Sequence, residues 1–207
     1  MGFTLNLFTD QWLRDAGGYT AYTSEIALSP EGGVYVLGSF RGVFNISNKV
    51  LNSIHIDKSR KPTSDIFLAK YSSEGNLIWI QTGFSSEHSI PKSLAVNSSG
   101  AVITGHYRKE IKFNNNSLYS KAKRNSVFIV KYSPAGKVQW TKSSRNLKFA
   151  TSSKAVFDST GDVIVGGSFD EVFSISEFSI KKNMSKNVFL VKIAPEGTVK
   201  WLKLVTG

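Results

Sequence analysis

The 207-residue chain contains no cysteine and only three histidines, two methionines and five prolines. The lack of cysteine excludes disulfides, thiolate metal sites and cysteine nucleophiles, and it is compatible with any redox compartment. No apolar run approaches the roughly 20 residues of a transmembrane helix, so no membrane span is expected. No stretch keeps a 3.6-residue apolar period between capping signals, so no helix longer than about two turns is expected.

The first residues, 1–8, lack the basic start and the small-residue cleavage site of a signal peptide. The sequence therefore assigns no compartment, and an extracytoplasmic location is expected only if a signal peptide has been removed.

Tryptophan and glycine instead recur along the chain at one interval. Trp79, Trp140 and Trp201 are separated by steps of 61 residues, and Trp12 lies a further 67 residues upstream. The same step of 61 relates Gly75, Gly136 and Gly197, then Gly100 and Gly161, and also Gly105 and Gly166. A fixed period of this length indicates one supersecondary unit present in several copies.

Each copy contains four short runs of β-branched and aromatic residues. In the second copy these runs are Ser93–Val96, Ala101–Thr104, Val127–Lys131 and Lys137–Trp140. Turn-forming residues that end in glycine join the first pair and the last pair, which is typical of β-hairpins. We therefore predict four antiparallel strands per copy and an all-β chain.

Four antiparallel strands per repeat are typical of a β-propeller blade, whereas a sandwich, the main alternative, gives no reason for Trp to recur in every fourth strand. The predicted fold is β-propeller-like, with blades over about 23–81, 84–142 and 146–203 in one domain. Residues 1–16, which contain Trp12, are predicted to form an extra outer strand. The recurrent tryptophans, with Gly105 and Gly166, are assigned structural roles, and Lys70, Lys131 and Lys192 are expected to shield an outer strand.

The segments Asp65–Trp79 and Leu94–Gly105 resemble the bacterial SBBP-type β-propeller repeats. The resemblance covers about residues 20–205 and implies a propeller fold. It implies no shared catalytic residues. The residue before the third strand is Asp65 in one copy but Ser126 and Asn187 in the others, which argues against a role that needs an acid in every blade.

Three blades are fewer than the four to eight that usually close a propeller. Three arrangements are compatible with this count. The chain is part of a longer or naturally partial propeller, or two copies associate into one ring as a homo-oligomer, or the arc stays open with protected ends.

The net charge of +11 is concentrated in the loops between the second and third strands. The loops of the first two copies hold a net +4 and +5, so together they account for nine of the eleven charges. In the third copy Asp170, Glu171 and Glu177 balance the lysines.

The candidate binding residues are Lys58, Arg60, Lys61, Arg108, Lys121, Lys123 and Arg124, which are expected to contact an acidic polymer or a protein partner. The alternative is an ordinary solvated surface. Nucleic acid is an unlikely ligand, because only Tyr107 and Tyr119 could stack on bases.

No motif indicates a catalyst or a cofactor. The histidines His55, His88 and His106 have no metal-ligand spacing, and His106 is interpreted as a surface residue. Asp158 with Asp162, and Asp170 with Glu171, could act as acid and base in glycan cleavage, but Asp158 is better explained as a turn former. We therefore expect a non-catalytic binding or assembly scaffold, with a ring-completing structural unit and, less favoured, a glycan-cleaving enzyme as alternatives.

Overall fold

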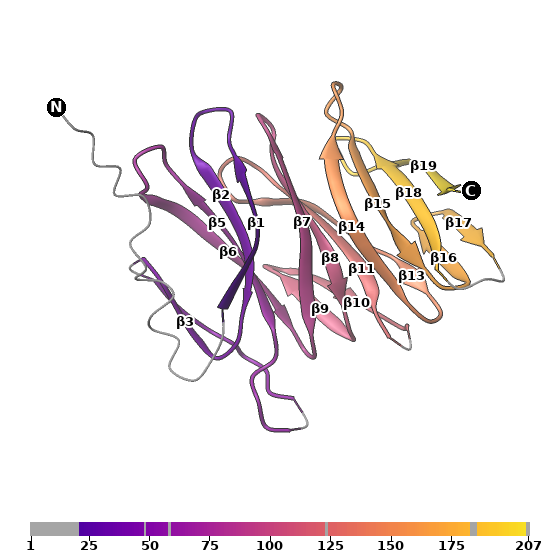
Figure 1. Ribbon diagram of the computed structural model, residues 1–207, viewed down its shortest axis with the longest axis horizontal. Helices are drawn as coiled ribbons and strands as arrows, with labels where there is room; N and C mark the ends of the chain where they lie inside the picture. Colours follow the sequence, from indigo (N-terminus) through magenta and orange to yellow (C-terminus); the bar gives the residue numbers. More distant parts are fainter. Residues whose placement is uncertain (1–20, 48, 58, 123, 183–185, 206–207) are drawn as a thin grey trace.

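The computed structural model describes residues 21–47, 49–57, 59–122, 124–182 and 186–205, and no helix occurs among them. The prediction of an all-β chain is confirmed. Figure 1 shows three antiparallel sheets side by side in chain order, and they do not close into a ring. The predicted strand within residues 1–16 lies outside the described residues.

Each repeat forms one four-stranded meander. Sheet 1 contains β1 (Ala21–Leu28), β2 (Val34–Phe40), β5 (Asp65–Tyr71) and β6 (Leu77–Ser85). Sheet 2 contains β7 (Ser89–Asn97), β8 (Gly100–Tyr107), β11 (Ser126–Tyr132) and β12 (Val138–Ser143). Sheet 3 contains β14 (Ala150–Phe157), β15 (Val163–Phe169), β18 (Asn187–Ile193) and β19 (Val199–Val205).

The segments between the second and third strands were expected to be loops, and this prediction was incomplete, because each contains a short hairpin. The hairpins are β3 (Val43–Ile46) with β4 (Lys49–Asn52), β9 (Glu110–Phe113) with β10 (Asn116–Tyr119), and β16 (Val172–Ile175) with β17 (Phe178–Lys181). Their tight turns place Ser47, Asn114 and Ser176 at φ of 52°, 51° and 52°. No glycine occupies these turns, so the usual glycine signal was missing.

Two of the hairpins pair with the preceding repeat. Strand β9 of repeat 2 pairs with the end of β6, where Gly83 lies opposite Phe113. Strand β16 of repeat 3 pairs with β13 (Arg145–Asn146), which follows the last strand of repeat 2. Among the described residues, β3 pairs only with β4. Backbone hydrogen bonds therefore join neighbouring repeats.

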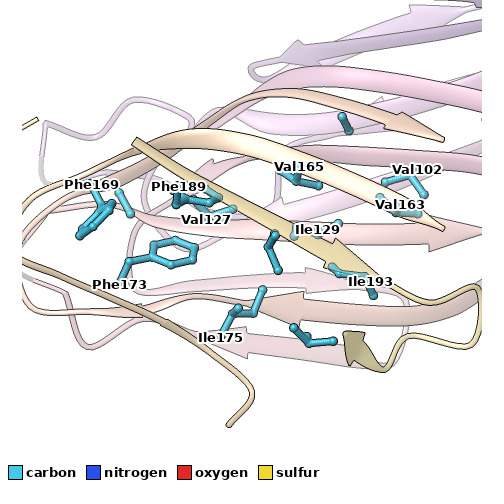
Figure 2. Close-up of a cluster of buried hydrophobic side chains, with 14 of the residues drawn as sticks. Val102, Val127, Ile129, Val163, Val165, Phe169, Phe173, Ile175, Phe189 and Ile193 are labelled. Carbon is cyan, nitrogen blue, oxygen red and sulfur yellow. The ribbon is translucent and has the colours of Figure 1, made fainter. Parts of the chain in front are cut away.

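Sheet 2 is covered on both faces, because alternate residues of a strand point to opposite sides. On β8 and β11, Ile103 and Val130 pack in the cluster shared with sheet 1. Their neighbours Val102, Val127 and Ile129 pack in the cluster shared with sheet 3, which Figure 2 shows. The continuous apolar run of β11 reflects burial on both sides.

A glycine lies opposite a phenylalanine in the centre of every sheet. Gly38, Gly105 and Gly167 are the Cα partners of Phe67, Phe128 and Phe189, respectively. The sequence alignment instead matched Gly105 with Gly166. It was off by one residue because the β7–β8 turn is one residue shorter than the β14–β15 turn: four residues separate Val96 from its partner Ala101, whereas five separate the equivalent pair, Phe157 and Val163.

The recurrent tryptophans are half-buried and connect one repeat to the next. The indole N–H of Trp79 donates to the carbonyl oxygen of Pro134 at 3.0 Å, and Trp140 donates to Pro195 at 2.9 Å. Each ring covers the turn glycine of the following repeat, so that a Cβ at Gly136 would lie 2.8 Å from Trp79 Cδ2. Trp201 occupies the same place on the last described strand, and no described repeat follows it.

Replacing Trp140 with Ala should lower the free energy of unfolding by about 2 kcal/mol. Full burial of a tryptophan would give 3–5 kcal/mol, but this ring is only half-buried. Trp140→Phe keeps much of the ring and removes the hydrogen bond to Pro195, so it should cost about 1 kcal/mol. Urea denaturation would measure both values. Equal losses for the two variants would contradict a role for ring packing.

Candidate functional site: a basic loop rim

The predicted binding residues gather at one end of the sheets. Because the strands are antiparallel, the segments between second and third strands and the links between repeats all lie at this end, which is the lower end in Figure 1. We define the basic loop rim by its described members, which are all exposed: Arg60, Lys61, Arg108, Lys121 and Arg124. The candidates Lys58 and Lys123 lie outside the described residues.

The first loop is fixed against the link between repeats 1 and 2. The carboxylate of Asp57 accepts hydrogen bonds from the backbone N–H groups of Ser59 and Lys61, at 2.8 and 3.0 Å. Farther along, the carbonyl oxygen of Ser64 accepts from the hydroxyl of Ser89 at 2.8 Å. The loop that carries Arg60 and Lys61 is therefore attached to the framework at its C-terminal side.

The second loop contacts the links on both of its sides. The backbone N–H of Arg108 donates to the carbonyl oxygen of His88 at 3.2 Å. The backbone N–H of Arg124 donates to the carbonyl oxygen of Lys148 at 3.0 Å, and the carbonyl oxygen of Asn125 accepts from the backbone N–H of Ala150 at 2.9 Å. The rim is thus a series of loops connected through the backbone.

The cations of the rim have little internal compensation. Arg108 donates from Nε to the neutral side chain of Asn125 at 2.9 Å. Its neighbour Lys109 is paired with Glu87 at 2.7 Å, and this lysine holds the pKa of Glu87 below its ordinary value. Within the described part of the chain, none of the five rim residues forms an ion pair with a carboxylate. Their positive charge is therefore free to attract an anion.

In repeat 3 the acidic residues at this end are engaged. Glu171 forms an ion pair with Lys148, and the carboxylate of Asp170 accepts from the backbone N–H of Lys186 at 3.1 Å. The positive rim consequently belongs to repeats 1 and 2, as the loop charges predicted.

Of the two carboxylate pairs considered for glycan cleavage, Asp158 and Asp162 belong to an ion cluster at the opposite end. The ammonium nitrogen of Lys192 lies 2.7 Å from Oδ2 of Asp158 and 3.1 Å from Oδ2 of Asp162, and the ammonium nitrogen of Lys200 lies 2.7 Å from Oδ2 of Asp162. Pairing with Lys192 lowers the pKa of Asp158, and pairing with Lys200 lowers that of Asp162. A general acid needs a raised pKa, so neither residue suits that role. Asp158 also accepts from the N–H groups of Thr160 and Asp162, which confirms it as a turn former.

His106 is not the surface residue that was expected. It is largely buried, and its Nδ1 lies 2.8 Å from the hydroxyl oxygen of Thr151 in the next repeat. Burial, helped by the charges of Lys92 and Arg108, lowers its pKa to about 4. Across the residues that the structure describes, no three His, Asp or Glu side chains gather as metal ligands.

Two buried ionisable groups were not identified from the sequence. Asp65 is fully buried, and its carboxylate accepts the N–H of Ser85 at 2.7 Å. Burial raises the pKa of Asp65 to about 6. Lys131, expected to shield an outer strand, is only 2% exposed, and its ammonium donates to the carbonyl oxygen of Pro195 at 3.2 Å. The recurrence of lysine at this position was the available signal, but the contacts differ: Lys131 reaches the next repeat, whereas Lys70 and Lys192 form ion pairs within their own repeats.

No protein-family model and no curated protein matches this chain. In the part of the chain that the structure describes, no helix has the length and apolar character needed to cross a membrane.

Proposed function

We propose that this chain is a non-catalytic scaffold of SBBP-type β-propeller blades, and that its basic loop rim binds an acidic polymer or the acidic surface of a protein partner. The observation that carries the proposal is the set of exposed, unpaired cations on loops attached to a rigid framework. Held cations lose less conformational freedom on binding than cations on free loops, so more of the electrostatic attraction appears as affinity.

The convergence of the first strands supports a radial arrangement of the blades. Strand β7 packs against both β1 and β14. Glu25 on β1 forms an ion pair with Lys154 on β14, across the intervening repeat. The first strands of all three repeats therefore lie close together, as strands do around a propeller axis.

The aromatic residues of the rim favour an acidic polymer or protein over single-stranded nucleic acid. Tyr107 is fully buried, and its hydroxyl lies 2.6 Å from that of Ser143. Tyr119 is 68% exposed and remains available. One exposed ring is a poor stacking platform, because single-strand binders align several aromatics along a basic groove.

Heparin, as a sulfated polymer, tests the proposal. The triple variant Arg60→Asn, Lys121→Asn and Arg124→Asn should bind a heparin fragment about tenfold more weakly than the wild type, because each exposed charge pair contributes at most about 1 kcal/mol. Titration calorimetry at low salt would measure the two affinities. Asparagine is chosen because it tolerates the positive φ of 60° at Arg60.

The matched control is the triple variant Lys181→Asn, Lys182→Asn and Lys186→Asn in repeat 3, which removes the same amount of charge. Lys186 also has a positive φ, of 61°. This control should bind heparin nearly as well as the wild type. Equal weakening by both triple variants would mean that net charge alone governs binding, and the rim would lose its assigned role.

A further inference from the structure

The contact between neighbouring repeats has two parts that occur twice in the described structure. A tryptophan of one repeat covers the turn glycine of the next, as Trp79 covers Gly136 and Trp140 covers Gly197. A hairpin strand then pairs with residues that follow this tryptophan in the chain, as β9 does with the end of β6 and β16 with β13. Both parts lie on the side of a repeat that faces its predecessor.

Repeat 1 carries the same receiving turn, and no tryptophan among the described residues covers it. Gly75 has a φ of 81°, close to the 78° of Gly136, and its N–H donates to the carbonyl oxygen of Ser72 at 3.1 Å as Gly136 does to Ser133 at 2.9 Å. Gly136 is buried beneath a tryptophan, whereas Gly75 is exposed. Among the described residues, no heavy atom lies within 4 Å of a Cβ built at Gly75.

The hairpin of repeat 1 is also incomplete. Strand β3 corresponds to β9 and β16, and in the described part of the chain its other edge has no strand beside it. In repeats 2 and 3 the equivalents of this edge and of the Gly75 turn both contact the preceding repeat. An unpaired strand edge is a template for a further strand. The edge of β3 and the Gly75 turn together define a docking surface, which we call the Gly75 surface.

We propose that the N-terminal segment of this chain, residues 9–18 with Trp12, docks on the Gly75 surface. The spacing along the chain matches the two contacts already seen. Trp79 precedes the first residue of β7, Ser89, by ten residues, and Trp140 precedes Ala150 of β14 by ten. Trp12 precedes Ala21 of β1 by nine.

A second copy of the chain could offer Trp201 to the same surface. The covalent connection favours Trp12, because a short linker gives the attached segment an effective concentration in the millimolar range. Trp12 then holds the Gly75 surface at all ordinary protein concentrations, and head-to-tail association through this surface is blocked.

Three single variants of the full chain test the proposal by thermal unfolding. Trp79→Ala removes an observed contact, Trp201→Ala removes a tryptophan that covers no turn in the described part of the chain, and Trp12→Ala removes the proposed contact. Trp12→Ala and Trp79→Ala should each lower the melting temperature by about 5 °C, and Trp201→Ala should lower it by less than about 2 °C. A Trp12→Ala variant that melts like Trp201→Ala would overturn the proposal.

A double-variant cycle with Gly75→Asn identifies the surface. Asparagine tolerates the positive φ at this position, and its side chain would collide with a ring placed as Trp79 is placed on Gly136. Gly75→Asn should lower the melting temperature when Trp12 is present and have little effect when Trp12 is Ala. Additive effects would contradict docking at Gly75.

Light scattering tests the alternative occupant, Trp201 of a second copy. A dimer that is lost in Trp201→Ala but kept in Trp12→Ala would assign the Gly75 surface to a second copy and overturn the proposal.

Discussion

Gly167→Ala is expected to lower the free energy of unfolding by about 3 kcal/mol, whereas Gly166→Ala should change it by less than about 1 kcal/mol. A Cβ at Gly167 would overlap the carbonyl oxygen of Thr151 and lie 2.7 Å from the ring of Phe189. A backbone oxygen and a packed ring cannot both move away. A Cβ at Gly166 would instead meet the end of the Leu190 side chain at 3.1 Å, and that side chain can adjust.

The two variants are adjacent and add the same methyl group, so each is the control for the other. Urea denaturation, followed by circular dichroism, would give both free energies. If Gly166→Ala were the more damaging variant, the sequence alignment of Gly105 with Gly166 would be correct and the register of β15 against β18 would be wrong.

Asp65→Asn is expected to stabilise the protein at pH 7 by up to about 3 kcal/mol. Burial raises the pKa of Asp65 to about 6 from the ordinary 3.8, and each pKa unit corresponds to about 1.4 kcal/mol. Asparagine fits this position because Asn187 occupies it in repeat 3, where it lies opposite Phe169 as Asp65 lies opposite Phe40. The side-chain oxygen of Asn can still accept the N–H of Ser85.

The sign of the effect gives the pH dependence. A raised folded-state pKa means that the contribution of Asp65 to stability is fully present below about pH 4 and is lost as the pH rises through about 6. The difference in unfolding free energy between Asp65→Asn and the wild type should therefore be small at pH 3.5 and grow to its full value by pH 7. Taking the difference removes the opposite contribution of His106, whose lowered pKa is present in both proteins. A difference that is independent of pH would contradict burial of an ionisable Asp65.

The four strands of each repeat could be predicted because turn glycines and alternating apolar residues are local signals. The hairpins between the second and third strands were missed because Ser47, Asn114 and Ser176 occupy the turns where glycine was expected, and because each hairpin strand is only four residues long. The misplacement of Gly166 has a different origin. A fixed period cannot detect that one turn is a residue shorter when a later loop restores the spacing.

The location of the basic loop rim followed from topology, since antiparallel strands fix the end at which each loop lies. The ionisable groups inside the fold could not be found in this way. Asp65 and Lys131 are buried by contacts with residues 20 and 64 positions away, Ser85 and Pro195. Packing between residues far apart in the chain, within a repeat for Asp65 and between repeats for Lys131, decides which polar side chains are removed from water.

The hairpins that cross between repeats have a consequence for how such chains can evolve. The hairpins of repeats 2 and 3 are each encoded within one repeat but complete the hydrogen bonding of its predecessor. Duplication of a 61-residue stretch of the gene therefore yields a unit that is immediately compatible with its neighbours, whereas a deletion that starts inside a repeat disrupts two sheets at once. The architecture is therefore expected to tolerate the gain or loss of whole repeats better than a deletion that begins within a repeat.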